Sequence, residues 1–247
     1  MAGLTGKVAI VTGGSRGIGA GIARRLAADG AKVVVGYAQR EEAAQQVVRR
    51  IEQSGGEAMA LQADMGDLRA IERLFTEVMD RFRRLDILVN NAAIAERLSL
   101  DSLDAGHFER MFHVNVRGPL FAMQQAARHF HGPGCRIINL SSGITQVPAP
   151  MAPVYAATKA ALENLTRSIA HDLGPRGITV NAVAPGATES DMLDAFMSAE
   201  QKQQVIASTP LGRLGTPEDI AAVVAFLASE EGGWITGQVI YAGGGLR

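Results

Sequence analysis

Near its amino end the chain reads Lys7-Val8-Ala9-Ile10-Val11-Thr12 and continues as Gly13-Gly14-Ser15-Arg16-Gly17-Ile18-Gly19. The β-branched run predicts a strand over Lys7–Thr12, and the apolar pattern that follows predicts a helix from about Ile18 to Asp29. Glycines let the backbone turn tightly and approach a pyrophosphate, which the next helix attracts through its free N–H groups and its dipole. The glycine spacing differs from the commoner G-x-G-x-x-G, but the order of strand, glycines and helix predicts a dinucleotide-binding turn.

Short β-branched segments alternate with longer helical patterns along the rest of the chain, which is typical of βαβ units. We expect further strands at Lys32–Gly36, Ala58–Gln62, Ile87–Asn90, Cys135–Leu140, Thr179–Val183 and Gln238–Tyr241. We expect further helices at Glu41–Gln53, Leu68–Phe82, Phe108–Phe130, Ala152–Leu173 and Pro217–Ser229, with Thr216 as the N-cap of the last. The sequence therefore predicts one α/β domain over residues 1–247, a Rossmann-type doubly wound parallel sheet with helices on both faces. An excursion at about 187–214 is expected to cover the substrate.

Composition excludes several classes of function. The 24 Lys and Arg residues nearly balance 25 Asp and Glu residues, and no basic block is present, so nucleic-acid binding is not expected. Cys135 is the only cysteine and the five histidines lack metal-ligand spacing, so we expect neither a disulfide framework nor a metal. The sequence shows neither a signal-peptide pattern nor an apolar run of about 20 residues, which predicts a soluble, cytoplasmic protein that does not bind membranes.

A second group of residues points to proton transfer. Tyr155 and Lys159 are four positions apart in a predicted helix, with Ser142 upstream. Positions i and i+4 share a face about 5–6 Å apart, so the Lys159 ammonium is expected to lower the pKa of the Tyr155 phenol from its usual value near ~10. That change would make the phenol usable as a general acid or base, while Ser142 holds the same substrate oxygen. Taken alone, Tyr155 and Lys159 are also consistent with an exposed pair on a helix, and Ser142 with an ordinary strand end. Their order and spacing behind the glycine turn favour a redox site.

Six motifs in this order resemble the short-chain dehydrogenase/reductase (SDR) family, and the resemblance runs from about Gly6 to Gly244. The motifs are Thr12–Gly19, Asn90-Asn91-Ala92, Asn115, Ser142, Tyr155-x-x-x-Lys159 and Pro185-Gly186. Segments 213–220 and 235–238 are similar to the branch that contains 3-oxoacyl-[acyl-carrier-protein] reductases and glucose dehydrogenases. The resemblance implies four catalytic residues, Asn115, Ser142, Tyr155 and Lys159, in which Asn115 anchors a water relay to the lysine.

The resemblance also implies a nicotinamide dinucleotide. The second strand is followed by Tyr37 and Ala38 rather than by the acid of NAD enzymes, and Arg16 lies where NADP-dependent relatives carry a basic residue, with Arg40 able to assist. We therefore expect NADPH/NADP+. Asp64 is expected at the adenine ring, although a simple N-cap of the helix at Leu68 is an alternative. The expected cofactor-binding residues are Gly13, Ser15, Arg16, Gly17, Ile18, Gly19, Tyr37, Asp64, Met65, Asn91, Ala92, Tyr155, Lys159, Pro185, Gly186, Thr188 and Ser190.

The segments expected to cover the nicotinamide are mostly apolar, which favours a hydrophobic or acyl ketone over a sugar. The expected substrate-binding residues are Ser142, Ile144, Tyr155, Met192 and Phe196. These features predict an NADP(H)-dependent carbonyl reductase that converts a small-molecule ketone to a secondary alcohol.

Two alternatives to a general carbonyl reductase stay open. The first is a 3-oxoacyl-[acyl-carrier-protein] reductase, for which Arg128 and Arg167 are candidate docking cations, although His171 stands where relatives often have arginine. The second is a non-catalytic nucleotide-binding scaffold. The resemblance further implies a homotetramer.

Overall fold

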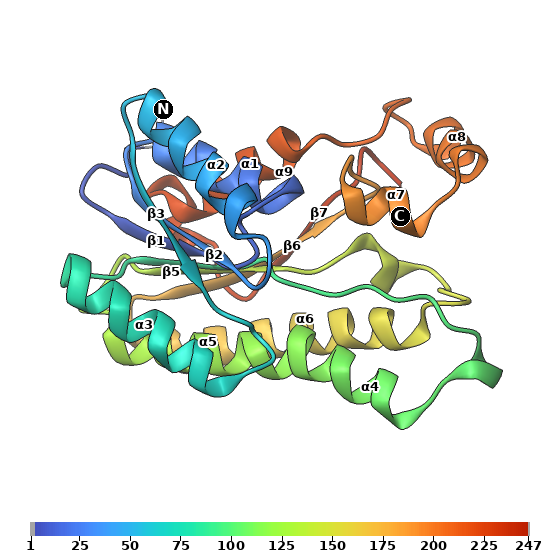
Figure 1. The fold of residues 1–247 in the computed structure, drawn as a ribbon, viewed down its shortest axis with the longest axis horizontal. Helices are drawn as coiled ribbons and strands as arrows, with labels where there is room; N and C mark the ends of the chain where they lie inside the picture. The colour runs from blue at the N-terminus through green and yellow to red at the C-terminus, as the bar shows by residue number, and fades with distance from the viewer. Residues whose placement is uncertain (1–2, 247) are drawn as a thin grey trace.

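A computed structural model describes residues 3–246 of the chain. Its strands form one parallel sheet in the order β3-β2-β1-β4-β5-β6-β7 (Figure 1). This order confirms the predicted doubly wound sheet. The strands are β1 (Val8–Val11), β2 (Lys32–Tyr37), β3 (Glu57–Gln62), β4 (Ile87–Asn90), β5 (Arg136–Leu140), β6 (Thr179–Pro185) and β7 (Val239–Ala242).

Helices cover both faces of the sheet (Figure 1). One face carries α1 (Gly17–Ala28), α2 (Glu41–Gln53) and α9 (Pro217–Ala228), and the other carries α3 (Leu68–Phe82), α5 (Gly118–His129) and α6 (Pro153–Leu173). Strand β1 shows why an aliphatic run is needed here: Ala9 and Val11 pack on the first face, whereas Val8 and Ile10 pack on the second. A strand buried on both faces has no polar side, which accounts for its unbroken apolar sequence.

The order in which the chain adds strands to the sheet reverses at β1. Strand β2 pairs with one edge of β1, and β4 pairs with the other. Loops after these strands therefore diverge, and a crevice forms beyond their carboxyl ends, where ligands bind in open α/β sheets. Two short helices, α7 (Asp191–Phe196) and α8 (Ala199–Ser208), lie beyond the ends of β6 and β7 (Figure 1). They occupy most of the predicted excursion at 187–214, and we refer to residues 187–214 as the lid.

The stretch predicted to be helical over Phe108–Phe130 is helical in the structure from Ala105 to His129, but it is not one regular α-helix. The structure has α4 (Ala105–Phe112), a π-helical segment (His113–Arg117) and then α5. Pro119 explains part of this break, because it lacks the N–H that an α-helix would donate to the carbonyl of Asn115. A π-turn inserts one residue and redirects a side chain, here that of buried Asn115.

Other expectations fall close to the observed elements. Thr216 caps α9 as predicted: its hydroxyl accepts a hydrogen bond from the Asp219 backbone N–H, and the Asp219 carboxylate accepts one from the Thr216 backbone N–H at 2.8 Å. Within residues 3–246, no helix is long and apolar enough to cross a bilayer. The expected single domain over residues 1–247 stays a prediction, and Met1, Ala2 and Arg247 lie outside the described residues.

Candidate active site

A crevice of ≈ 720 Å³ runs along the carboxyl ends of β1 to β6. It brings together residues as far apart in the sequence as Gly13 and Met192, because parallel strands present their ends at one edge of the sheet. Most of the expected cofactor-binding residues line it: Gly13, Ser15, Arg16, Gly17, Ile18, Gly19, Tyr37, Asp64, Met65, Asn91, Ala92, Tyr155, Lys159, Pro185 and Ser190. Gly186 and Thr188 are not among the lining residues; Thr188 is buried and its hydroxyl donates to the Gly186 carbonyl at 3.0 Å.

The glycine turn is fixed by hydrogen bonds from the loop after β4. The Asn91 side-chain amide donates to the Thr12 carbonyl at 2.9 Å and to the Gly13 carbonyl at 3.0 Å. The close approach requires glycine: a Cβ at Gly13 would lie 2.8 Å from the Ala92 Cα, and Gly13 has φ +63. The role of Asn91 is therefore to hold the turn, a contact that the motif alone did not reveal.

The N-terminus of α1 opens into the crevice behind this turn. Within the described chain, its N-cap residue Arg16 makes no side-chain hydrogen bond to the first helical turn. Those backbone N–H groups and the helix dipole suit an anion such as a pyrophosphate. Arg16 and Arg40 supply cations at the rim of the crevice, beside Tyr37 at the end of β2. The residues present thus fit NADP(H), and Arg16 and Arg40 are the cations that would bind its ribose 2′-phosphate.

Asp64 does not cap a helix. Its carboxylate accepts a hydrogen bond from the Gly66 N–H at 2.8 Å, whereas Asp67 caps α3 by accepting from the Arg69 N–H. The alternative interpretation of Asp64 as the N-cap before Leu68 is therefore wrong. Asp64 lines the crevice, and its expected place at the adenine ring stays a prediction.

Helix α6 places Tyr155 and Lys159 on one buried face, four residues apart as predicted. The Lys159 Nζ lies 5.7 Å from the centroid of the Tyr155 ring and donates to the Leu140 carbonyl at 2.7 Å. The Ser142 hydroxyl accepts from the Ile144 N–H at 3.3 Å, at the start of a short 3-10 segment (Gly143–Gln146). The structure thus brings the phenol, the ammonium and the serine loop together.

The expected lowering of the Tyr155 pKa is wrong. Burial raises the pKa of Tyr155 to about 12, and the neighbouring Ser142 hydroxyl offsets only part of this effect. Burial also lowers the pKa of Lys159 to about 8. The low-dielectric surroundings disfavour both charged forms, and the Lys159 ammonium is directed at the Leu140 carbonyl. At neutral pH the site therefore holds a protonated phenol beside a mostly charged lysine.

Asn115 lies behind this pair on the π-turn. Its side-chain carbonyl accepts from the Ile94 N–H at 2.9 Å, and its amide donates to the Ile94 carbonyl at 2.8 Å and to the Thr158 hydroxyl at 3.1 Å. Asn115 thus ties the loop after β4 to α6 between the two catalytic candidates. The water relay to Lys159 stays a prediction.

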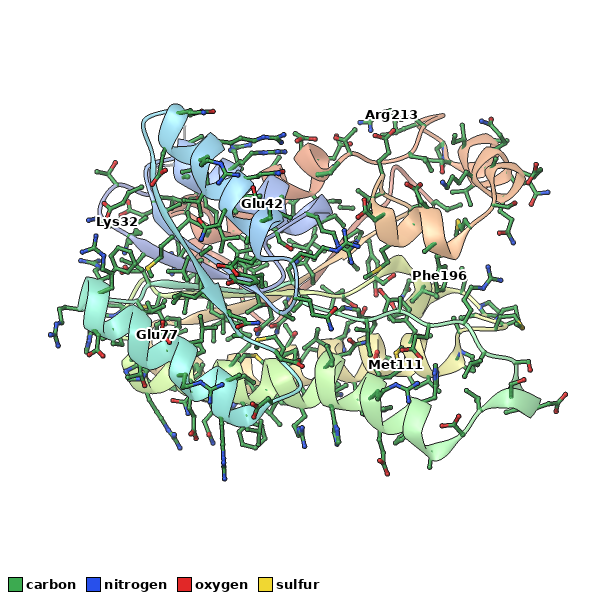
Figure 2. The ribbon with its side chains drawn as sticks, in the orientation of Figure 1. Lys32, Glu42, Glu77, Met111, Phe196 and Arg213 are labelled. Atoms are coloured by element: carbon green, nitrogen blue, oxygen red, sulfur yellow. The ribbon has the colours of Figure 1, made fainter. Side chains whose placement is uncertain are left out.

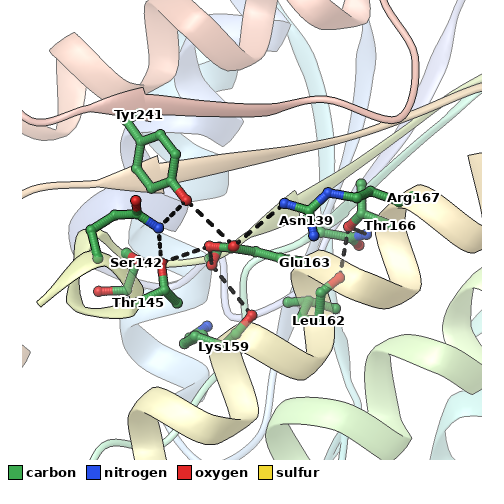
Figure 3. Close-up of polar contacts among 11 residues, drawn as sticks. Asn139, Ser142, Thr145, Lys159, Leu162, Glu163, Thr166, Arg167 and Tyr241 are labelled. Atoms are coloured by element: carbon green, nitrogen blue, oxygen red, sulfur yellow. Dashed lines mark hydrogen bonds and ion pairs between the residues drawn. The ribbon is translucent and has the colours of Figure 1, made fainter. Parts of the chain in front are cut away.

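Sequence reasoning missed Glu163, a buried carboxylate one turn beyond Lys159 (Figure 3). Its Oε1 accepts from the Ser141 hydroxyl at 2.7 Å and from the Thr145 hydroxyl at 2.9 Å, so it fixes the chain on both sides of Ser142. Its Oε2 accepts from the Tyr241 hydroxyl at 3.4 Å. Helical spacing from Tyr155 would have placed Glu163 on the catalytic face, since the two are eight residues apart.

The substrate side of the site is apolar. Ile144 and Phe196 pack against a cluster that contains Met111 and Tyr155, and Phe196 lies on the side of the lid that faces the helical layer below (Figure 2). The Phe196 and Tyr155 ring centroids are 6.2 Å apart. Arg97, a further residue that sequence reasoning missed, donates to the Phe196 carbonyl at 2.7 Å. Met192 lines the crevice, and its contact with a substrate stays a prediction.

Among the described residues, no group of three or more His, Cys, Asp or Glu side chains could hold a metal ion.

Comparisons with known proteins agree with this geometry. A family model described as enoyl-(acyl carrier protein) reductase matches residues 13–247. The chain is 41% identical to versicolorin reductase of Emericella nidulans, over 98% of this chain and 96% of the relative. It is 42% identical to a hydroxynaphthalene reductase of Aspergillus fumigatus, over 95% and 90% respectively. A crystal structure of a short-chain dehydrogenase of Burkholderia cenocepacia in complex with NADP matches with TM-score 0.93 and 46% identity, over 98% of both chains.

Proposed function

Since this chain belongs to the short-chain dehydrogenase/reductase family and is an oxidoreductase that uses NADP(H) on carbonyl or alcohol groups, we propose that it reduces a ketone to a secondary alcohol with Tyr155 as the general acid. The observation that carries this proposal is the buried pair on α6, a protonated phenol beside a lysine that is mostly charged at neutral pH.

The protonated phenol suits the reductive direction, in which it donates a proton. The bound dinucleotide would supply the hydride that reaches the carbonyl carbon. The carbonyl oxygen then becomes an alkoxide, a much stronger base than a phenolate, so the Tyr155 hydroxyl donates its proton without needing a lowered pKa. The Ser142 hydroxyl stabilises the same oxygen as charge develops, and Lys159 supplies positive charge nearby. Glu163 holds the serine loop in place through Ser141 and Thr145.

A hydrophobic ketone suits the lining of the site. Ile144 and Phe196 pack against the apolar cluster that contains Tyr155, and Met192 adds apolar surface at the crevice. Two relatives are named as reductases of versicolorin and of hydroxynaphthalene, and the second name denotes a fused aromatic ring system. We include an aryl ketone as the preferred substrate class in the proposal.

The carrier-protein alternative has weaker support. Arg167, one of its two candidate docking cations, lies 3.9 Å from the buried Glu163 carboxylate, which reduces its availability to an acidic partner. The non-catalytic scaffold is not retained, because the chain is an SDR oxidoreductase with both Tyr155 and Lys159 in place.

A homotetramer and a cytoplasmic location complete the proposal. Supporting the first, Phe226 and Trp234 are large apolar side chains that the fold leaves exposed, Trp234 almost fully. Light scattering coupled to gel filtration tests the assembly, and cell fractionation tests the location.

A substrate panel tests the proposed reaction. Purified protein is mixed with NADPH and either aryl ketones or acetoacetyl-coenzyme A, and loss of the reduced-nicotinamide absorbance is followed. We expect a higher kcat/KM for aryl ketones, and a lower kcat/KM when NADH replaces NADPH. A clear preference for acetoacetyl-coenzyme A would favour the carrier-protein alternative instead. No oxidation of NADPH with any carbonyl would contradict the proposed activity.

A further inference from the structure

Two arginines at the rim of the crevice share one carboxylate oxygen of the lid. Arg16 Nη1 lies 2.8 Å from the Asp191 Oδ2, and Arg40 Nη1 lies 3.2 Å from the same atom. Asp191 is the first residue of α7, directly after the N-cap Ser190. The first contact joins the glycine turn to the lid across 175 residues of sequence. The second joins the residue before α2 to the lid across 151 residues.

These are the cations expected to bind the 2′-phosphate that distinguishes NADP from NAD. All three side chains line the crevice that also contains the glycine turn and Tyr155. The end of β2 carries no carboxylate to neutralise these arginines, since it continues as Tyr37, Ala38 and Gln39. Asp191 is the acid that pairs directly with both Arg16 and Arg40.

The lid is joined to the glycine turn by Asp191 but is anchored elsewhere by backbone bonds. The Gly215 N–H donates to the Ala187 carbonyl at 2.9 Å, and the Glu189 N–H donates to the Gly215 carbonyl at 2.9 Å. Beyond this anchor, Ser190 lies close to the turn, because a Cβ added at Gly17 would be 3.3 Å from the Ser190 Cβ. A change at Asp191 can thus move α7 without disturbing the base of the lid.

We propose that Asp191 is an internal competitor of the 2′-phosphate, so that an incoming NADP(H) displaces it from Arg16 and Arg40 and releases the start of α7. This inference rests on the proposed cofactor site. A phosphate carries more charge and more acceptor oxygens than a carboxylate, and two arginines can bind it bidentately. NAD(H) lacks that group and leaves the Asp191 contacts intact. Asp191 then sets both the affinity for NADP(H) and the mobility of the lid.

The expected effect on affinity is moderate. Arg16, Arg40 and Asp191 are all about half exposed, and exposed ion pairs are weak individually. Asp191→Asn removes both ion pairs from the protein without NADPH, so NADPH no longer has to displace them. We expect this substitution to tighten NADPH binding by about three- to tenfold. Binding of NADH is expected to stay within about twofold of wild type, since no phosphate competes there.

Calorimetric titration of Asp191→Asn and wild type with NADPH and NADH tests the competition. Asp194→Asn is the matched control, because Asp194 lies on the same helix and pairs with Lys202 inside the lid. We expect tighter NADPH binding for Asp191→Asn alone. Unchanged NADPH affinity would overturn the inference and make the contacts ordinary surface pairs. Weaker NADPH binding would overturn it in the other direction, by showing that Asp191 orients the arginines for the phosphate.

Arg16→Ala separates failure of the inference from failure of the cofactor site. If Arg16→Ala weakens NADPH but not NADH while Asp191→Asn changes neither, the phosphate site stands and only the competition is wrong. If Arg16→Ala also leaves both affinities unchanged, the proposed placement of the 2′-phosphate fails as well.

Hydrogen exchange of the amides in α7 tests the coupling to the lid without any turnover. Wild-type protein is compared with 2′,5′-ADP and with 5′-AMP at equal occupancy, so that only the 2′-phosphate differs. We expect faster exchange in α7 with 2′,5′-ADP by about threefold or more, and no difference between the two ligands in Asp191→Asn. Equal exchange with both ligands in wild type would overturn the release of α7.

Discussion

The buried Lys159 predicts a pH dependence that can be worked out from the structure. Burial lowers the pKa of Lys159 to about 8, so the ratio of charged to neutral lysine is about ten to one at pH ~7 and about one to ten at pH ~9. If the charged form is the active one, the rate of ketone reduction falls about tenfold over this interval, with a midpoint near the Lys159 pKa. The Tyr155 phenol stays protonated throughout, because its pKa is about 12.

The assay is kcat/KM for NADPH at saturating ketone, which reports ionisations of the protein before the dinucleotide binds. Lys159→Met removes the ammonium while keeping a similar chain length in the buried site. We expect its kcat/KM to be lower by about a hundredfold or more at pH ~7 and nearly constant between pH ~7 and ~9. Lys32→Met is the control, since Lys32 pairs with Glu57 on the surface and should retain the wild-type profile.

Two results would refute this reasoning. A wild-type profile that is flat between pH ~7 and ~9 would mean that burial does not shift the Lys159 pKa into this range. A decline that persists unchanged in Lys159→Met would assign the ionisation to another group.

Further substitutions test the supporting contacts. Glu163→Leu removes the carboxylate that accepts from the Ser141 and Thr145 hydroxyls and leaves them only the Lys159 and Ser142 carbonyls, so it should lower the free energy of unfolding by about 1–3 kcal/mol in urea titrations. Glu163→Gln keeps a side-chain acceptor and should cost less. Equal losses for the two variants would contradict this account. Asn115→Leu removes the bonds to Ile94 and should raise KM for the ketone as well as lower stability by about 2 kcal/mol, and an unchanged KM would argue against its positioning role. Thr216→Ala should cost about 1 kcal/mol in thermal or urea unfolding without changing kcat, and no loss would mean that the cap is not stabilising.

The fold could be predicted from the sequence because its signals are local. The aliphatic strand at Val8–Val11, the glycines after it and the alternation of strands with helices each depend on neighbouring residues. The break near Asn115 could not be predicted in the same way, since Pro119 is tolerated in the first turn of a helix and gives no warning of a π-turn.

The site was predictable where spacing along one element decides the geometry. Tyr155 and Lys159 share a face of α6 because they are four residues apart, and this follows from helix geometry alone. The raised pKa of Tyr155 could not be predicted from this spacing, because it depends on burial by other elements and on which group the Lys159 ammonium contacts. The Arg16–Asp191 contact joins residues 175 positions apart and has no local pattern that could announce it.

The central claim is that Tyr155 donates the proton when the ketone is reduced. The most direct test is the single-turnover rate of ketone reduction by Tyr155→Phe at saturating NADPH. The substitution removes only the hydroxyl, so the ring still packs against Phe196 and calorimetry should show NADPH binding within about twofold of wild type. We predict that the single-turnover rate of ketone reduction falls by about a thousandfold, because the general acid that protonates the alkoxide is lost. A rate within about tenfold of wild type, with NADPH bound, would show that the proton comes from elsewhere.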